Sequence, residues 1–139
     1  MKKLLWLFIL PLLIIGCAKD YYTSYQSASE GKEYGTLIVK FSNPIKNVNI
    51  TVDGNLIAED KFTERVEVAN MPVGKHKVKV IASSWELKDD VNNVEEMNIQ
   101  PNSKQTMLVE VPPKSTGYWI YQTAIYTVTF ITSYYLYEW

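Results

Sequence analysis

The feature that most constrains the fold is an apolar residue at every second position through much of residues 36–111. Alternation of this kind gives a strand one buried and one solvated face. The alternating positions are Leu37, Val39 and Phe41; Val48, Ile50 and Val52; Val66 and Val68; Val78 and Val80; Met97 and Ile99; and Met107, Val109 and Val111. Since no helical period competes in this region, the sequence predicts an all-β domain of six or seven short strands.

Turn-forming residues separate the predicted strands. They are Ser42-Asn43-Pro44, Asp53-Gly54, Met71-Pro72-Val73-Gly74 and Pro101-Asn102, and Pro112-Pro113 closes the domain. Asp53-Gly54 suits a tight hairpin because both residues tolerate a positive φ. Short strands spaced about 8 to 12 residues apart, with turns between them, favour a small antiparallel β-sandwich. We place this domain at residues 35–113.

The same region resembles the PEGA domain family, small prealbumin-like or immunoglobulin-like β modules of bacterial envelope proteins. The likeness is carried by Gly35-Thr36-Leu37-Ile38-Val39, by residues 48–54, and by residues 71–80, which follow the family's l-x-G-x-H-x-V-x-V strand. The chain departs from the family at residues 44–47, where only the proline of the family's tetrapeptide is kept. It also has Ser84-Trp85 where the family has Gly-Tyr. The resemblance implies a sandwich fold with His76 in a structural position.

The N-terminus has the pattern of an export signal. Lys2-Lys3 is followed by an apolar run from Leu4 to Ile15, which is shorter than the roughly 20 residues of a membrane span. The run ends in Ile14-Ile15-Gly16-Cys17, which resembles the lipobox of bacterial lipoproteins. By that resemblance the leader, residues 1–16, is cut between Gly16 and Cys17, and Cys17 is diacylated. An uncleaved anchor helix that happens to end in cysteine is the alternative.

Acylation would give Cys17, the only cysteine, the role of a membrane anchor. Two or three acyl chains, at about 0.8 kcal/mol per buried CH₂, hold a protein stably, whereas one chain does so only marginally. Residues 17–34 are polar and aperiodic and are expected to form a tether. Ala18 replaces the aspartate that favours inner-membrane retention in enteric bacteria, so the outer membrane is favoured for a Gram-negative host.

The C-terminal segment, residues 114–139, is rich in aromatic residues and carries no charge from Gly117 to Tyr137. As a helix, residues 117–139 would be about 34 Å long, with aromatic rings at both ends like the belts of a membrane-embedded helix. The candidate contact residues are Trp119, Tyr121, Tyr134, Tyr135 and Trp139. The richness in threonine and aromatic residues also suits strands. The absence of turn residues favours one continuous element, so we predict a helix that contacts a membrane or a partner, with extended strands or disorder as alternatives.

Few residues in the predicted domain suggest a catalytic or metal-binding role. His76 is the only histidine and is expected to pack in the core or a turn. Asp89-Asp90 and Glu95-Glu96 gather oxygen ligands but match no EF-hand loop, so we expect a solvated acidic loop, with a Ca²⁺ site as the alternative. One cysteine excludes an intramolecular disulfide. We therefore predict no catalytic residue, no metal site and no cofactor.

The charge balance gives no reason to expect nucleic acid as a partner. Without Lys2 and Lys3 of the leader, the chain has 12 basic and 15 acidic residues, which gives a net charge of −3. Lys75, Lys77 and Lys79 form a basic row, but they alternate with inward residues, as on the solvated face of a half-buried strand.

These observations predict a non-enzymatic envelope lipoprotein that is held to the membrane through lipid on Cys17. Its domain would bind or scaffold another envelope component. The alternative is an accessory subunit of an envelope export or assembly complex, held through the C-terminal segment. An enzyme would need acidic residues to converge from separate strands, which sequence patterns do not indicate.

Overall fold

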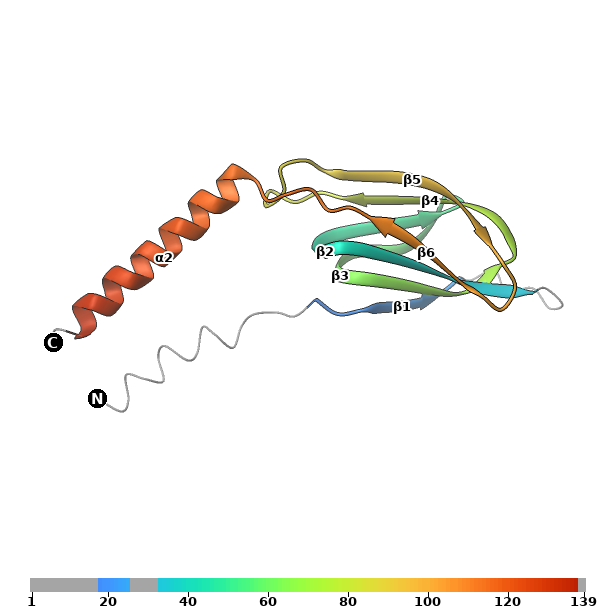
Figure 1. Ribbon diagram of the computed structural model, residues 1–139, viewed down its shortest axis with the longest axis horizontal. Coiled ribbons are helices and arrows are strands. Elements are labelled where there is room, and N and C mark those ends of the chain that lie inside the picture. Colours follow the sequence, from blue (N-terminus) through green and yellow to red (C-terminus); the bar gives the residue numbers. More distant parts are fainter. Residues whose placement is uncertain (1–17, 26–32, 138–139) are drawn as a thin grey trace.

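The computed structural model describes residues 18–25 and 33–137, with Leu136 and Tyr137 described in their backbone only. Its elements are β1 (Tyr21–Ser24), β2 (Tyr34–Val52), β3 (Asn55–Pro72), β4 (Gly74–Ala82), β5 (Val91–Ile99), β6 (Lys104–Val109) and α2 (Thr116–Tyr137) (Figure 1). The predicted leader, Gly16, Cys17 and Trp139 lie outside the described residues. The described chain is mostly β-sheet with one C-terminal helix, so the β-rich fold and the helical form of the tail are confirmed.

Strands β2 and β3 are unusually long and form the centre of the sheet, whose order is β1-β3-β2-β4-β5 with β6 also on β2. The first half of β2 pairs with β6 over Thr36–Phe41, and its second half pairs with β4 over Val48–Val52. In Figure 1, β2 runs to the end of the sheet from which α2 leaves, folds over and returns, and β3 follows it. One sheet therefore makes two layers.

The bend in β2 corrects the prediction that Ser42-Asn43-Pro44 is a turn between two strands. The chain remains in β2 throughout, and the register with β3 shifts between Lys40 and Ile45 and again between Ile45 and Val48. Bulges of this kind bend a strand and increase its twist without ending it. Polar turn-forming residues therefore mark the fold-over of a continuous strand.

The predicted antiparallel pairing is also wrong in part, because the sheet is mixed. β1 pairs with β3 and β6 pairs with β2 in parallel, whereas the other three pairings are antiparallel. The direction of β6 follows from the fold-over. β5 runs in the direction of the returning half of β2, and a turn at residues 100–103 reverses the chain, so β6 runs along the outgoing half. Alternation specifies which face of a strand is buried, but not which neighbour it pairs with.

We call the end where β2 bends and α2 leaves the proximal end, and the opposite end the distal end (Figure 1). The described chain also begins proximally. The Thr63 hydroxyl, on the folded-over part of β3, donates a 2.7 Å hydrogen bond to the carbonyl of Lys19. Tyr21–Ser24, which we expected within a tether, then forms β1 along Val66–Ala69.

The distal end contains the predicted Asp53-Gly54 hairpin, which is confirmed by φ values of 52° and 83°. One oxygen of the Asp53 carboxylate accepts the amide of Lys77 at 2.8 Å, and the other lies 2.6 Å from Nδ1 of His76. The Nε2 of His76 lies 2.8 Å from the carbonyl of Pro72. His76 is buried between these two partners, so the expected structural position of the histidine is confirmed.

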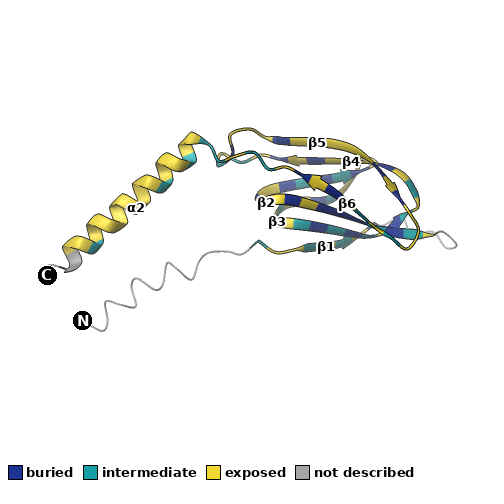
Figure 2. Cartoon of the chain, viewed as in Figure 1, coloured by how far each residue is buried: buried dark blue, intermediate teal, exposed yellow. Residues whose placement is uncertain are grey.

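The core lies between the two layers (Figure 2). Its largest fully buried side chains are Phe41, Leu37, Ile50, Met71, Ile99 and Met107. Gly35 allows β2 to pass close to the distal turn that joins β5 and β6. A Cβ on Gly35 would meet the carbonyl oxygen of Gln100 at 2.5 Å and Cγ2 of Ile99 at 2.6 Å. A side chain at position 35 would therefore force these segments apart.

On the outer face of the β6 layer, Ile38 breaks the alternation yet is buried. It pairs in register with Glu67, whose carboxylate accepts hydrogen bonds from Lys104 at 2.9 Å and Arg65 at 2.6 Å. The hydrogen bond from Lys104 is the main cause of the lowered pKa of Glu67, and Arg65 adds to it. Charged side chains therefore surround an apolar residue on the outside of the sheet.

Candidate interaction surface on helix α2

Helix α2 begins at a well-defined cap. The hydroxyl of Ser115 accepts the amide of Tyr118 at 3.1 Å, as an N-cap residue does, and itself donates to the carbonyl of Trp85 at 2.9 Å. The amide of Ser115 donates to the carbonyl of Glu86 at 2.8 Å, and Leu87 forms a bridge with Lys114. These contacts fix the start of α2 to the loop between β4 and β5.

Glu86 supports this junction electrostatically. Its carboxylate accepts hydrogen bonds from Lys114 at 2.8 Å and Lys46 at 2.7 Å, which links the loop to the bend of β2 and to the residues before α2. The side chain of Glu86 is only 15% exposed. The hydrogen bond from Lys114, followed by that from Lys46, lowers the pKa of Glu86. The carboxylate is therefore held in its charged form where three segments meet.

Aromatic rings complete the junction. The ring of Trp85 lies 6.2 Å from that of Tyr118 and 5.6 Å from that of Tyr121, the latter in an edge-to-face arrangement. The ammonium of Lys114 lies 4.8 Å from the centre of the Tyr118 ring. Contacts of these kinds stabilise a junction by about 0.5–1.5 kcal/mol each. The first turns of α2 are thus packed on the domain.

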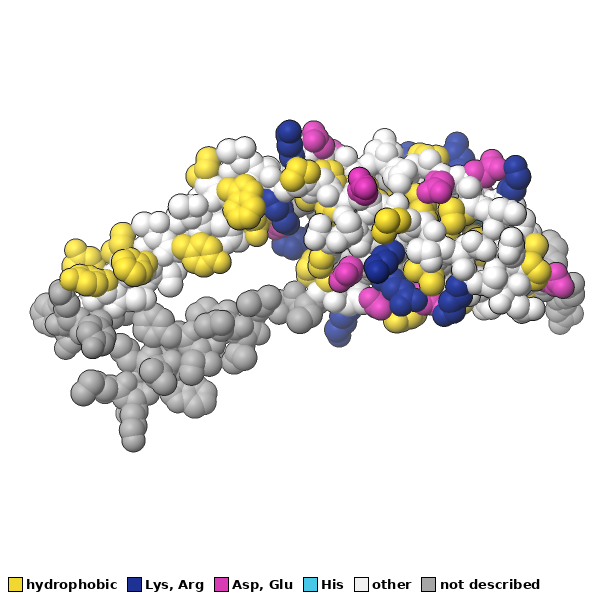
Figure 3. Space-filling model, in the orientation of Figure 1, with side chains coloured by type: hydrophobic (Ala, Val, Ile, Leu, Met, Phe, Trp, Pro, Cys, Tyr) yellow, Lys and Arg dark blue, Asp and Glu magenta, His cyan; other side chains and the backbone are white. Residues whose placement is uncertain are grey.

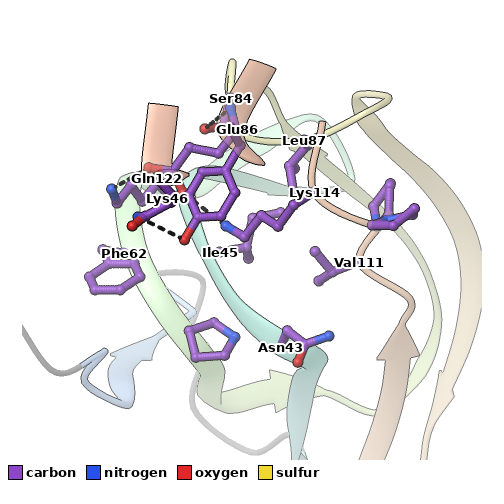
Figure 4. Close-up of a pocket in the computed structure, with 14 residues that line it drawn as sticks. Asn43, Ile45, Lys46, Phe62, Ser84, Glu86, Leu87, Val111, Lys114 and Gln122 are labelled. Atoms are coloured by element: carbon purple, nitrogen blue, oxygen red, sulfur yellow. Dashed lines mark hydrogen bonds and ion pairs between the residues drawn. The ribbon is translucent and has the colours of Figure 1, made fainter. Parts of the chain in front are cut away.

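A hollow of about 750 Å³ lies beneath the junction (Figure 4). Phe62, Tyr118, Pro112 and Pro113 are among the residues that line it. The charged side chains that line the hollow are Lys46, Lys114 and Glu86, and they already pair with one another. The hollow therefore offers apolar and aromatic surface in place of a free acid, base or nucleophile.

Beyond Gln122, α2 extends away from the sheet and is exposed around its circumference (Figures 1 and 2). Phe130 is 73% exposed and Tyr126 is 70% exposed. No residue of the segment Thr116–Tyr137 is charged, whereas charged side chains are spread over the sheet (Figure 3). The apolar positions follow no single face, since aromatic and aliphatic residues occur on every side. Ordinary soluble domains expose apolar residues singly, whereas here exposed apolar residues are contiguous along the helix, as at an interaction site.

The threonine and serine hydroxyls in this part of α2 are satisfied within the helix. Thr123, Thr127, Thr129, Thr132 and Ser133 each donate a hydrogen bond of 2.7–2.9 Å to the carbonyl four residues earlier. This back-bonding lets serine and threonine side chains leave water without an unpaired donor. These five threonine and serine side chains therefore add little to the cost of moving the helix into an apolar environment.

The predicted contact residues Trp119, Tyr121, Tyr134 and Tyr135 all lie on α2 and are more than half exposed. Tyr121 packs on Trp85 in the junction, and the ring of Trp119 contacts that of Tyr118 in the same turn of the helix. Tyr134 and Tyr135 lie on the free part of the helix. Sequence patterns missed the junction partners Trp85 and Glu86, because their contacts with α2 depend on the fold. Ser115 carried a local signal, since a serine directly before a predicted helix is a preferred N-cap.

Within residues 18–25 and 33–137, no helix is both long enough and apolar enough to cross a membrane. In the same described part of the chain, no three histidine, cysteine or acidic side chains come together as a metal site. Asp89, Asp90, Glu95 and Glu96 are exposed. Glu96 forms an ion pair with Lys75 at 2.9 Å.

No family model matches the sequence, and a comparison with curated proteins finds none similar to it. The likeness to PEGA domains therefore rests only on the residues quoted from the sequence.

Proposed function

We propose that this chain is an envelope lipoprotein in which acylated Cys17 holds a non-enzymatic β domain against a membrane. The observation that carries the proposal is the sequence Ile14-Ile15-Gly16-Cys17 directly after a basic and then apolar leader. Lys19, two residues after Cys17, is held at the proximal end by Thr63, which favours a membrane-facing proximal end. For a Gram-negative host, Ala18 favours the outer membrane.

We further propose that the domain is a PEGA-like sandwich that binds or scaffolds another envelope component. Two layers around one apolar core and the Asp53-Gly54 hairpin agree with that family's architecture. The distal turns at Asp53-Gly54 and at residues 100–103 lie at the end of the sheet opposite the start of β1 (Figure 1). In an anchored molecule these turns would face away from the bilayer, where they could meet a partner.

The anchor is tested on the full chain produced in bacterial cells that are fed an alkyne-bearing fatty acid. We expect the mature protein to begin at Cys17, to carry acyl chains by mass spectrometry, and to fractionate with membranes. Cys17→Ser should abolish both processing and fatty-acid labelling, because a hydroxyl does not replace the thiol. Ala18→Ser is the matched control and should leave both unchanged. An intact leader with an unmodified Cys17 thiol in the unaltered chain refutes the proposal.

The exposed length of α2 favours a second possibility, an accessory subunit of an envelope export or assembly complex. Truncation after Gln122 would remove the free part of α2 and retain the Trp85 junction. If the helix holds a complex together, proteins that copurify with the full chain in mild detergent should be lost from the truncated one, while its acylation persists. Unchanged copurification would exclude this role.

A further inference from the structure

We propose that helix α2 lies in the interfacial layer of the lipid bilayer, at the boundary between headgroups and acyl chains. The inference rests on the proposed anchoring through Cys17 and adds a second, protein-encoded contact with the same membrane. The occupant of the exposed α2 surface is therefore lipid.

The first described residues and the start of α2 lie at the same end of the sheet, so an anchor on Cys17 would bring α2 to the bilayer. Lys19 is bonded to Thr63 at the proximal end, and Ile45, the register partner of Thr63, lines the hollow beneath the first turn of α2. Two residues of extended chain span about 7 Å, so acyl chains on Cys17 would hold the proximal end within about that distance of the membrane. Helix α2, about 33 Å long, leaves from this end, and its direction is set by the Ser115 and Trp85 contacts.

The polar groups of α2 indicate how deep it lies. It has no charge to desolvate, and the hydroxyls from Thr123 to Ser133 already bond to the helix backbone. Tyrosine hydroxyls cannot bond in this way. Those of Tyr126, Tyr134 and Tyr135 make no hydrogen bond to any described residue, so in hydrocarbon they would lose their water partners. The interfacial layer offers apolar surface together with headgroups and water, and it is where tyrosine and tryptophan concentrate.

The distribution of apolar residues favours lipid over a docked protein. A helix that binds one groove carries a single apolar stripe. Ile120, Tyr126, Val128, Phe130 and Tyr134 are each more than half exposed, and they project in several directions around α2. In the interfacial layer, acyl chains on one side of the helix and headgroups on the other can contact these side chains in all directions, whereas a single protein surface would leave part of them in water.

The test uses the full chain with p-benzoylphenylalanine in place of Phe130. A second protein with the probe in place of Leu56, which is 54% exposed on β3 beside the distal Asp53-Gly54 hairpin, is the matched control. Both are irradiated in the membranes of the producing cells, and again in vesicles of phosphatidylethanolamine and phosphatidylglycerol. We expect phospholipid adducts from position 130 in both settings and none from position 56. Val128→Asp with Ile131→Asp should remove the adducts, because the charges resist leaving water, whereas Leu56→Asp should not.

The outcomes separate this inference from the anchor. Acylated Cys17 with protein adducts, or no adducts, at position 130 overturns the interfacial helix and leaves the lipoprotein proposal standing. An unmodified Cys17 with phospholipid adducts at position 130 overturns the anchor and supports the helix contact. Adducts between two copies of this chain would also count against lipid as the occupant of the α2 surface.

Discussion

Replacement of Gly35 by alanine tests the close approach of β2 to the distal turn. The new Cβ would lie 2.5 Å from the carbonyl oxygen of Gln100, 2.6 Å from Cγ2 of Ile99 and 3.1 Å from the carbonyl oxygen of Ser103. Two of these atoms belong to the backbone. The turn cannot easily move away, because the amide of Thr36 donates to Ser103 and the amide of Asn102 donates to Tyr34, each at 2.9 Å.

The size of the effect follows from two opposing terms. Extra atoms in a filled site cost about 1–3 kcal/mol, and here the contacts with backbone favour the upper part of that range. Alanine also restricts the unfolded chain, which offsets about 0.4–1 kcal/mol. We expect Gly35→Ala to lower the free energy of unfolding by about 2 kcal/mol, which moves the urea midpoint down by about 1 M. The measurement is urea unfolding of the full chain in mild detergent, followed by circular dichroism.

Gly117 provides the matched control. A Cβ there meets only the Ser115 hydroxyl, at 3.8 Å, so Gly117→Ala has room in the first turn of α2. Since alanine favours helix over glycine by up to about 1 kcal/mol, this change should be neutral or stabilising. If Gly35→Ala unfolds within about 0.5 kcal/mol of the unaltered chain, the close approach of the backbone would be refuted.

Three further predictions concern other contacts. Hydrogen bonds from lysine lower the pKa values of Glu67 and Glu86 in the folded chain. The stability that these two groups contribute is therefore present above the unfolded carboxyl pKa and is lost as the pH falls through the lower folded pKa values. Glu86→Gln should flatten the fall in melting temperature between neutral and acidic pH. Ser115→Ala removes the N-cap and should cost about 1 kcal/mol, detected as faster amide hydrogen exchange in the first turn of α2, whereas Ser115→Thr should retain most of the protection. His76→Ala removes the partner of one oxygen of the Asp53 carboxylate and of the Pro72 carbonyl and should cost about 1–3 kcal/mol in urea unfolding, and an unchanged midpoint would contradict a role for these contacts in stability.

Part of the fold could be predicted from local patterns. Alternation identified the buried positions of most strands, since these depend on the face that a residue occupies in its own strand. Asp53-Gly54 was predictable as a hairpin, because the backbone conformation it requires is encoded in two adjacent residues. The helical form of residues 116–137 followed from the absence of any turn residue in a long segment.

The remainder depends on contacts between distant residues. Ser42-Asn43-Pro44 favours a turn in isolation, yet pairing with β3 keeps these residues in one bent strand. Tyr21–Ser24 has too little pattern to predict β1, whose existence depends on the free edge of β3. The junction of α2 likewise needed Glu86 to meet Lys46 and Lys114, which come from three separate segments.

The start of β1 and the end of β6 both lie at the proximal end, which has a mechanical consequence. β1 begins at that end and β6 finishes there, and each lies along a neighbouring strand, with four register pairs for β1 and six for β6. A force that pulls the start of β1 or the end of β6 away from the distal turns acts along the strand axes. The backbone hydrogen bonds of β1 or of β6 would then be sheared together and not peeled apart one by one.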